Sequence, residues 1–462
     1  LGYSLVMPSP KHNRRPRATF NADHRRRTHV PAPSDAEIER RLDEFVKPAV
    51  FAELDFYRRL GLRNRILTLP VMVSLVLALI WRRIPGVCAL QRTLARERIF
   101  WATPRTVSQS ALSDRFLDFP AVLFEQVLYR VLAHLPERLR RRTRPLPSLL
   151  AGVAARFSGL YALDATTLEP LFRKLAALRD TPGTHLAGHV SVAVELLSHL
   201  PAKLWWNPEP HTNEKALARP VLDWLPTGSV VVFDLGYFAY WLFDALSAQE
   251  SFFVTRLREQ ASYSVRTMLC NRAKVRDQII QLGRYKEPCT HPMRLIEVEV
   301  NGRWQRYLTN VLDPKRLSIV EVVALYDARW KRETSFLLIK RLLDLSYVWV
   351  GSQNGIWLQV VATFLMYALL LDLCDDVAQA LGVQLEAISV EMVYRGLYHY
   401  VVAVAQGEYQ GDAPSYLARE AKGLGILKRE RPSRRPSATE QIRLALVGPP
   451  LPNANVTEAR KR

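Results

Sequence analysis

The stretch Leu325-Tyr-Asp-Ala-Arg-Trp-Lys-Arg-Glu-Thr-Ser-Phe-Leu-Leu-Ile-Lys-Arg341 decides how this chain is interpreted. It has no Gly or Pro and mostly good helix formers, so it predicts a helix. At about 100° per residue, an arc of roughly 60° on one face carries four chemically distinct side chains: Tyr326, Arg329, Glu333 and Lys340. Trp330 and Leu337 lie near this stripe, which predicts that the face meets protein. The alternative is a solvated face with an ordinary ion pair between Arg329 and Glu333.

The spacing Tyr-x2-Arg-x3-Glu-x6-Lys resembles the Tyr-Arg-Glu-Lys signature of the type-four family of bacterial insertion-sequence transposases. The resemblance implies a DDE enzyme with a ribonuclease H-like core. It therefore requires two Asp residues upstream of Glu333, each at the end of a strand.

Two apolar strands upstream end in Asp. Residues Tyr161–Leu168 predict a strand that ends at Asp164, and Gly228–Tyr237 predict one that delivers Asp234 at its carboxyl end. Alone, either Asp is explained equally well as a turn or cap residue. The conjunction of both strands with the four-residue signature favours the catalytic interpretation.

The remaining pattern follows the order of a ribonuclease H-like sheet. A hairpin is predicted over residues 187–206, a helix over 214–225 and a further strand over 251–256. Residues 294–300 and 303–309, joined by Asn301-Gly302, predict a second hairpin. The fold class expected is α/β: a ribonuclease H-like core with a mixed sheet flanked by helices, interrupted by a β-rich insertion and preceded by an all-α N-terminal domain.

Shifts in composition predict six regions. In chain order they are a basic disordered tail, a helical DNA-end-binding domain, the first part of the core, the β-rich insertion, the second part of the core with the Glu333 helix, and a C-terminal helical region that ends in a basic tail. Their bounds are 1–34, 35–150, 151–256, 257–315, 316–385 and 386–462. Val107–Arg115 has a helix-turn-helix rhythm, for which a plain helical hairpin is the alternative. The basic stretch Arg138–Pro147 predicts a linker, either solvated or lying on a DNA backbone.

Charge points to a polyanionic partner. The 462 residues include 64 Lys+Arg against 44 Asp+Glu, a net charge of +20, which favours nucleic acid first and anionic membrane second. The 4 Cys show no metal-ligand spacing, so a reduced, cytoplasmic protein is expected. The apolar runs Ile66–Trp81 and Ile356–Leu371 are shorter than the ~20 residues of a membrane-spanning helix and predict buried core helices instead.

The resemblance implies that Asp164, Asp234 and Glu333 are the catalytic residues and the metal ligands. Hard carboxylate oxygens suit Mg²⁺ or Mn²⁺. Two ions per site activate a water and stabilise the leaving oxygen of a phosphodiester. The nucleophile would be water first and then the freed 3′-hydroxyl.

The resemblance also implies DNA contacts. The predicted contact residues are Tyr326, Arg329, Lys340, Trp304, Arg256 and Arg258. Trp304 has an alternative role as a cross-strand packing aromatic. Asn213-Glu214-Lys215 resembles a further stretch of the family, although a helix cap by Asn213 is a sufficient explanation.

The function expected is cut-and-paste DNA transposition by a nucleoid-associated bacterial enzyme. Its partners would be double-stranded DNA, as terminal inverted repeats and target, and a second copy of the chain, with no membrane. Two alternatives share the fold: a catalytically silent or domesticated DNA-binding derivative, and a metal-dependent nuclease without strand transfer.

Overall fold

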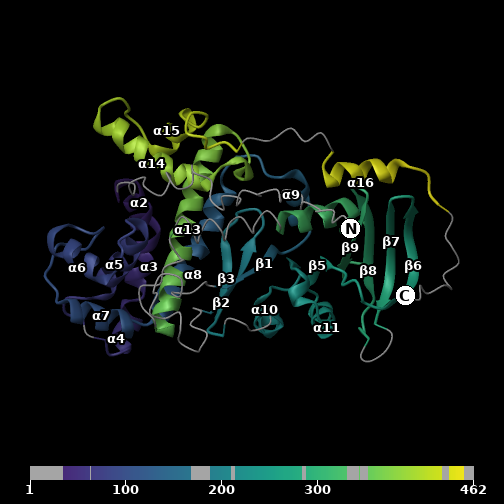
Figure 1. Ribbon diagram of the computed structural model, residues 1–462, viewed down its shortest axis with the longest axis horizontal. Helices are drawn as coiled ribbons and strands as arrows, with labels where there is room; N and C mark the ends of the chain where they lie inside the picture. The colour runs from purple at the N-terminus through teal and green to yellow at the C-terminus, as the bar shows by residue number, and fades with distance from the viewer. Residues whose placement is uncertain are drawn as a thin grey trace, which may run out of the picture.

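A computed structural model of the chain describes residues 35–62, 64–167, 188–209, 214–283, 288–329, 343, 352–428 and 436–451. The predicted N-terminal tail 1–34, Glu333 and Lys340 lie outside these residues. The described part is elongated, with helices gathered at one end and strands at the other (Figure 1).

Helices form the whole N-terminal part of the described chain. Leu42–Val46 is one turn of π-helix (η1) between α2 and α3. The α-helices are α2 (Asp35–Arg41), α3 (Lys47–Ala52), α4 (Leu54–Arg59), α5 (Leu69–Trp81), α6 (Val87–Arg96), α7 (Gln109–Asp118), α8 (Ala121–Arg140) and α9 (Ser148–Ala154). The predicted helix-turn-helix stretch begins in the loop before α7, where the Ser108 side chain caps the helix by accepting from the Ala111 N–H.

The long helix α13 (Gln353–Leu381) joins the helical end to the sheet. It packs along α8 and α5 and touches β3, so it runs through the middle of the molecule (Figure 1). At 29 residues it extends well beyond the predicted apolar run and is long and apolar enough to cross a membrane. However, 94% of its most apolar window is buried within the protein. The helix therefore serves as core, as the sequence predicted.

The strands form one nine-stranded sheet in the order β3-β2-β1-β4-β5-β9-β8-β7-β6. β1 pairs in parallel with β4, and β4 in parallel with β5, whereas the other pairs are antiparallel. The bounds are β1 (Leu160–Thr167), β2 (His189–Glu195), β3 (Pro201–Asn207), β4 (Val230–Val232), β5 (Phe252–Arg256), β6 (Tyr263–Arg272), β7 (Val275–Leu282), β8 (Met293–Val300) and β9 (Arg303–Thr309).

Both predicted hairpins are present, as β2–β3 and β8–β9. The strands of the expected insertion do not stand apart from the core. β9 pairs with β5, so β6 to β9 extend the core sheet, and the left-handed Asn301 and Gly302 form the tight turn between β8 and β9.

The two faces of the sheet are covered by different helices. Alternate residues of β1, β4 and β5, among them Ala162, Val232 and Val254, pack against α9 and the helical residues 319–329. The residues between them, such as Val231 and Phe253, pack against α10 (Ala218–Trp224) and α11 (Tyr240–Ala248). Strand alternation therefore assigns each side chain near the strand ends to one of these two faces.

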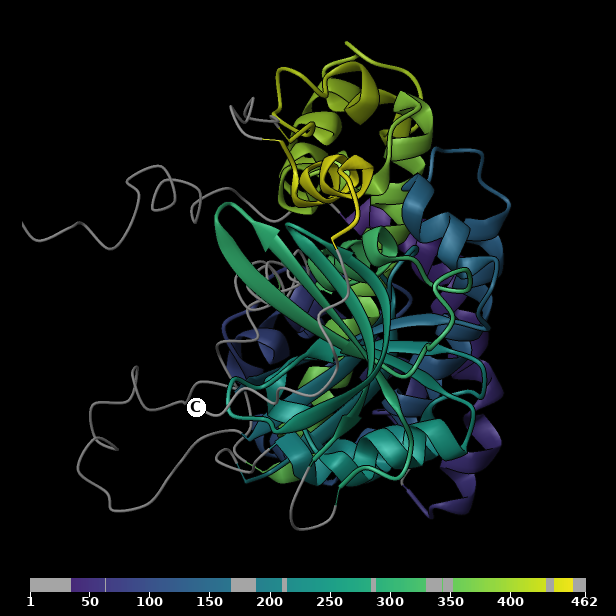
Figure 2. The same ribbon diagram turned by 90° about the vertical axis from the view of Figure 1, so that its right-hand side faces the viewer.

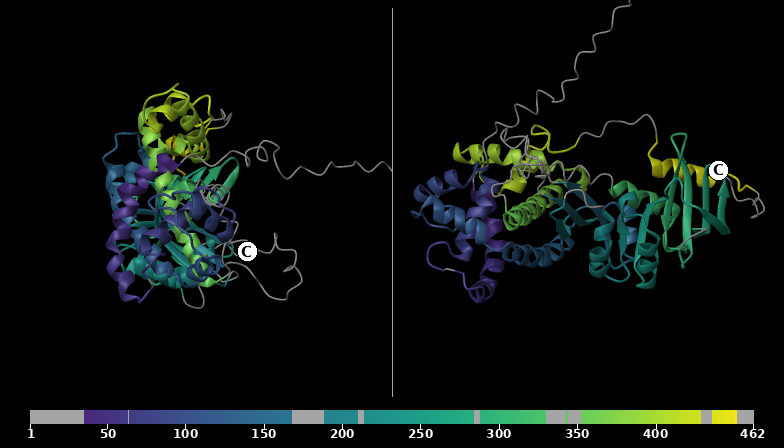
Figure 3. Two further views of the ribbon diagram at one scale, coloured as in Figure 1. Left: turned by 90° about the vertical axis from the view of Figure 1, so that its left-hand side faces the viewer. Right: turned by 60° about the horizontal axis from the view of Figure 1, so that its bottom comes forward.

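The C-terminal region returns to both ends of the molecule. α14 (Val390–Ala405) and α15 (Ala413–Arg419) pack with α13, and α16 (Ala438–Val447) lies across β7 and β8. Figure 1 and the right-hand view of Figure 3 show α16 over the sheet, away from the other C-terminal helices, whereas Figure 2 looks from the sheet end, with α16 in front of them. The Gln441 side chain joins α16 to the β8–β9 turn by donating to the Asn301 side chain at 3.2 Å.

The basic stretch Arg138–Pro147 is neither a wholly solvated joint nor a bare DNA-binding segment. Arg142 donates to Asp372 and Asp375 of α13 at 2.7 and 2.6 Å, and Arg144 donates to Asp375 as well. The carboxylates of Asp372 and Asp375 are fully buried and require cationic partners, which this stretch supplies. Among the arginines of this stretch, only Arg140 and Arg141, with side chains more than three-quarters exposed, remain in solvent.

Candidate acidic site at the carboxyl edge of the sheet

Two Asp residues occupy matching positions on neighbouring parallel strands. Ala162 of β1 is paired with Val232 of β4. Asp164 follows Ala162 by two positions, and Asp234 follows Val232 by two positions. Parallel neighbours lie about 5 Å apart, and residues two positions on share a face. The register thus carries both carboxylates, each half-buried, to the same edge of the sheet.

Local hydrogen bonds hold each Asp. The Asp234 carboxylate accepts from the Gly236 N–H at 2.8 Å, which caps the 3₁₀ turn η5 (Leu235–Tyr237). The Asp164 carboxylate accepts from the Ala165 N–H at 3.0 Å. The cap role that the sequence offered as an alternative is present for Asp234. For Asp164 the predicted strand end is wrong, because β1 continues to Thr167 and Asp164 pairs with Val192 of β2. These hydrogen bonds orient both carboxylates at the level where β4 ends.

The face shared by Asp164 and Asp234 is the one that residues 319–329 cover. Ala162 and Val232, two positions before each Asp, pack in the same core as Val322, Leu325 and Tyr326. The helical residues 319–329 lead directly toward Glu333, the predicted third acid, which lies outside the described residues.

A capping box starts this helical segment. The Ser318 N–H and hydroxyl both donate to the Glu321 carboxylate at 2.8 Å, and the Glu321 N–H donates to the Ser318 hydroxyl at 3.4 Å. Arg156, just after α9, also donates to Glu321 at 2.5 Å. Burial works against ionisation of Glu321, but the bonds from Ser318 and Arg156 outweigh it and hold the pKa of Glu321 below its usual value.

Arg256 links the edge of the sheet that carries Asp164 and Asp234, called the acidic edge below, to the helical residues 319–329. It ends β5, two positions after Val254, which pairs with Val232, so its register position is next to that of Asp234. Its guanidinium lies 5.7 Å from the ring centre of Tyr307 and 5.6 Å from that of Tyr326. The two rings meet edge to face at 5.4 Å. Arg329 lies 5.3 Å from the Tyr326 ring.

This cluster is largely enclosed by protein. Tyr326 is 4% exposed and Arg329 is 3% exposed, whereas Arg256 is half-buried. Burial, with the charge of Asp327, raises the pKa of Tyr307 to about 12 against the opposing effect of Arg256. Arg256 is therefore the member of the cluster best placed to meet a ligand, and Tyr326 and Arg329 support it from the helix.

The other predicted contact residues lie elsewhere. Arg258 is exposed after β5, with its guanidinium 5.3 Å from the Phe238 ring. Trp304 is 42% exposed on β9, with Arg276 at 5.0 Å from its ring. Since Trp304 and Tyr307 are an odd number of positions apart on a regular strand, Trp304 belongs to the opposite face from the Arg256 cluster. Lys340 lies outside the described residues.

The acidic edge has the donor chemistry of a hard cation site. Asp164 and Asp234 present carboxylate oxygens, the donors that Mg²⁺ and Mn²⁺ prefer. Within the described ranges no group of three or more His, Cys, Asp or Glu side chains is arranged to hold a metal ion. The predicted third ligand, Glu333, is not among the described residues. Only Asp164 and Asp234 can therefore be checked against the ligand preferences of these ions.

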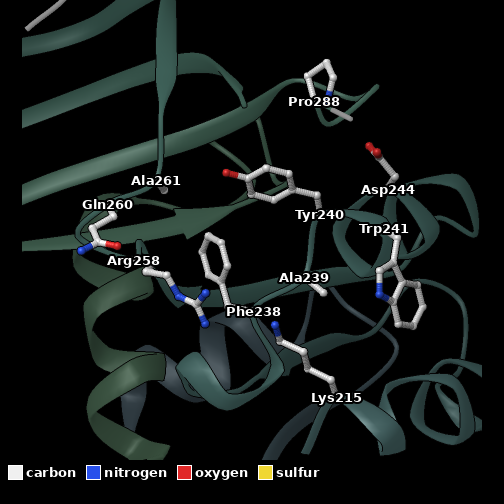
Figure 4. A pocket seen from close by; sticks show the side chains of 10 residues that line it. All are labelled: Lys215, Phe238, Ala239, Tyr240, Trp241, Asp244, Arg258, Gln260, Ala261 and Pro288. Atoms are coloured by element: carbon white, nitrogen blue, oxygen red, sulfur yellow. The ribbon is translucent and has the colours of Figure 1, made fainter. Parts of the chain in front are cut away.

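Sequence reasoning missed Tyr307 and a pocket beside the acidic edge. For Tyr307 the sequence offered only its place in the predicted hairpin strand 303–309, because nothing local indicates that this strand pairs with β5. The pocket, of about 540 Å³, is lined by Lys215, Phe238, Tyr240, Trp241 and Arg258 among others (Figure 4). These residues come from segments that are far apart in the sequence, so no local pattern indicates the pocket.

The region that holds these strands is similar in sequence to known proteins. Residues 159–369, which include both Asp residues and all the core strands, match the family model described as a transposase DDE domain. A Sinorhizobium fredii protein named as a transposase (y4zB) is 25% identical over 281 residues, covering 58% of this chain and 72% of that protein. A Geobacillus stearothermophilus protein named as a transposase for insertion sequence element IS5377 is 26% identical over 166 residues, covering 35% of this chain and 43% of that protein.

Proposed function

Because the matched domain and the named relatives support a DDE transposase of the insertion-sequence kind, we propose that this chain catalyses cut-and-paste transposition. It would hydrolyse a phosphodiester at the end of an element and then join the freed 3′-hydroxyl to target DNA. The assignment to the type-four family rests on the spacing of Tyr326, Arg329, Glu333 and Lys340.

One observation carries the proposal: Asp164 and Asp234 follow paired residues of parallel strands at equal distances, on the face from which residues 319–329 lead toward Glu333. Two carboxylates brought this close repel one another unless a cation binds between them. A structural role gives no reason to place them at one strand edge.

In this proposal Asp164, Asp234 and Glu333 hold two Mg²⁺ or Mn²⁺ ions. The bound ions supply a nucleophile at neutral pH and stabilisation of the leaving oxygen. The chain itself fixes Asp234 through Gly236, and it fixes the helical segment before Glu333 through the Ser318–Glu321 box.

We further propose that Arg256 contacts a DNA phosphate beside the acidic edge. A guanidinium suits bidentate phosphate contacts, and the rings of Tyr307 and Tyr326 fix its orientation. The predicted phosphate contacts of Arg329 and Lys340, and the stacking of Trp304 on a base, remain predictions. Double-stranded DNA and a second copy of the chain would be the partners.

Cleavage of a duplex that carries the flanking ends of the element tests this function. Purified protein with Mg²⁺ is compared with Asp234→Asn and Glu333→Gln, and Asp223→Asn, which changes an exposed acid on α10, serves as control. Both site variants are expected to lose cutting while the control keeps it. Cutting by Glu333→Gln at the parent rate would remove Glu333 from the site.

A second assay separates the alternatives. A pre-nicked end with a free 3′-hydroxyl is incubated with Mg²⁺ and a target plasmid. Joined product supports a transposase, whereas hydrolysis without joining indicates a nuclease of the same fold. Binding of the ends with neither reaction indicates a catalytically silent derivative.

A further inference from the structure

Arg294 of β8 is among the largest fully buried side chains of the residues that the structure describes. Its neighbour two positions on, Ile296, packs in the core under the helical segment 319–329, so Arg294 belongs to the same face of the sheet. Its partner is Asp277 of the adjacent strand β7, which is 1% exposed. The guanidinium donates to both Asp277 oxygens, through Nε at 2.8 Å and Nη2 at 2.7 Å. This bidentate pairing leaves Nη1 to donate elsewhere.

Nη1 of Arg294 holds the loop between β9 and the helical segment. It donates to the Leu317 carbonyl at 2.5 Å and to the Val311 carbonyl at 3.5 Å. Leu317 directly precedes Ser318, whose capping box starts the helical segment. Arg294 therefore fixes the last loop residue before the helix, and it does so from two strands of the predicted insertion.

The same loop is fixed to the core at its other end. Asn310, directly after β9, donates to the Ser251 carbonyl at 2.8 Å and accepts from the Phe253 N–H at 3.0 Å. The Val311 N–H donates to the Thr309 hydroxyl at 3.1 Å. The loop is thus anchored beside β5 at its start and on β7 and β8 at its end. These two anchors together fix the direction in which the helical segment leaves the sheet.

Stability alone does not explain an ion pair at this place. Desolvation of two buried charges costs about as much as their attraction returns, and apolar residues of similar volume are often equally stabilising. An apolar pair, however, supplies no donor for the carbonyls of the buried residues Leu317 and Val311. Arg294→Lys keeps the charge, but a single ammonium cannot reproduce the planar fork that meets Asp277 and Leu317 together. The loop, rather than the core, therefore requires a guanidinium.

We propose that Arg294, held by Asp277, is a positioning residue that sets where the helical segment meets the acidic edge. The inference rests on the proposed function, in which the third acid follows this segment in the sequence. Tyr326 of the segment contacts Arg256 beside that edge, so a shift of the loop displaces these two side chains from each other. Misplacement of reacting groups by about 1 Å lowers a rate about 100-fold. Arg294 is fully buried and acts through the loop.

Hydrogen exchange of the full-length protein, without metal or DNA, tests whether Arg294 holds the segment. Peptides that cover residues 311–329 are followed by mass spectrometry. They are expected to exchange roughly tenfold faster in Arg294→Lys, while peptides of β1 and β4 exchange as in the parent. Arg142→Lys, which weakens another buried ion pair at α13, is the matched control and should leave residues 311–329 unchanged. Exchange at the parent rate in Arg294→Lys would overturn the proposal.

Kinetics separate positioning from a general loss of stability. At a temperature where every variant is folded, Arg294→Lys is expected to cut the element end about 10- to 100-fold more slowly, with unchanged affinity for that end. Arg142→Lys should keep both values. Arg294→Met with Asp277→Leu removes both buried charges and should stay folded but cut slowly, because it lacks a donor for the loop. Full cutting by this double variant, or equal losses in Arg294→Lys and Arg142→Lys, would show a purely structural role.

The positioning role and the proposed function fail in different ways. If the parent cuts and Arg294→Lys cuts at the same rate, the proposed function stands and the positioning role is wrong. If the parent does not cut, the proposed function is wrong, and hydrogen exchange alone decides whether Arg294 holds the helical segment.

Discussion

The guanidinium of Arg256, at the end of β5, lies 5.6 Å from the ring centre of Tyr326 in the helical segment that leads to Glu333. This contact ties the strand next to Asp234 to the helical segment predicted to carry the third acid. Tyr307 of β9 packs against both partners, so the strand that joins the predicted insertion to the core also supports the site. Geometry at the acidic edge therefore depends on three segments that are far apart in the sequence.

Replacing Arg256 should impair DNA binding more than folding. Arg256→Lys keeps the positive charge but loses the planar group that stacks on Tyr307 and Tyr326. We expect affinity for a duplex element end to fall about tenfold in Arg256→Lys and further in Arg256→Ala, as measured by anisotropy. Arg266→Ala, an exposed cation on β6, provides the matched control. Unchanged affinity in Arg256→Ala would place the DNA strand elsewhere.

Replacing one acid of the acidic edge should abolish the stabilisation of the fold by divalent cations. In metal-free buffer, Asp164→Asn is expected to melt at or above the parent temperature, because the repulsion between Asp164 and Asp234 is relieved. Added Mg²⁺ or Mn²⁺ should raise the melting temperature of the parent but not that of the variant. Differential scanning fluorimetry gives both values, with Asp223→Asn as control. An equal rise in parent and Asp164→Asn would show that the ions bind at another place.

The capping box before Tyr326 should give a pH-dependent contribution to stability. Glu321→Ala is expected to lower the free energy of unfolding by about 1 kcal/mol at pH 7, and Glu321→Gln by less, because an amide preserves part of the box. The pKa of Glu321 is lower in the folded chain than in the unfolded chain. Its stabilisation is therefore complete above the unfolded value of about 4.3 and is lost as the pH falls through the folded value. Urea unfolding at pH 7 and near pH 3 should show the parent and Glu321→Ala converging at the lower pH.

The buried ion network on α13 should be among the most sensitive sites in the helical end. Asp375→Asn leaves Arg142 and Arg144 without their shared carboxylate, and breaking a buried pair costs about 3–5 kcal/mol. Arg140→Ala, in the same basic stretch but exposed, should change stability by less than about 0.5 kcal/mol. Chemical denaturation of both variants measures the contrast. A small loss for Asp375→Asn would mean that water replaces the missing partner.

Local patterns were sufficient for the strands but not for every strand end, since β1 continues past Asp164 to Thr167. The alternation and Asn301-Gly302 turn predicted the β8–β9 hairpin, and the apolar runs before Asp164 and Asp234 predicted β1 and β4. The apolar stretch around Ile356–Leu371 predicted a buried helix, although not the full extent of α13. These features depend on residues close in sequence, whose spacing sets the secondary structure and the face that each side chain occupies.

Long-range contacts decided the rest. The sequence did not reveal that Arg142 and Arg144 would be buried against α13 while Arg140 stayed in solvent. Nor did it show that β9 would join β5 and bring Tyr307 to Arg256, or that the turn after Asp234 would form a pocket with Lys215. The identity of a charged side chain specifies that it requires a partner or water, but not which one, because the partner is chosen by the packing of segments that are distant along the chain.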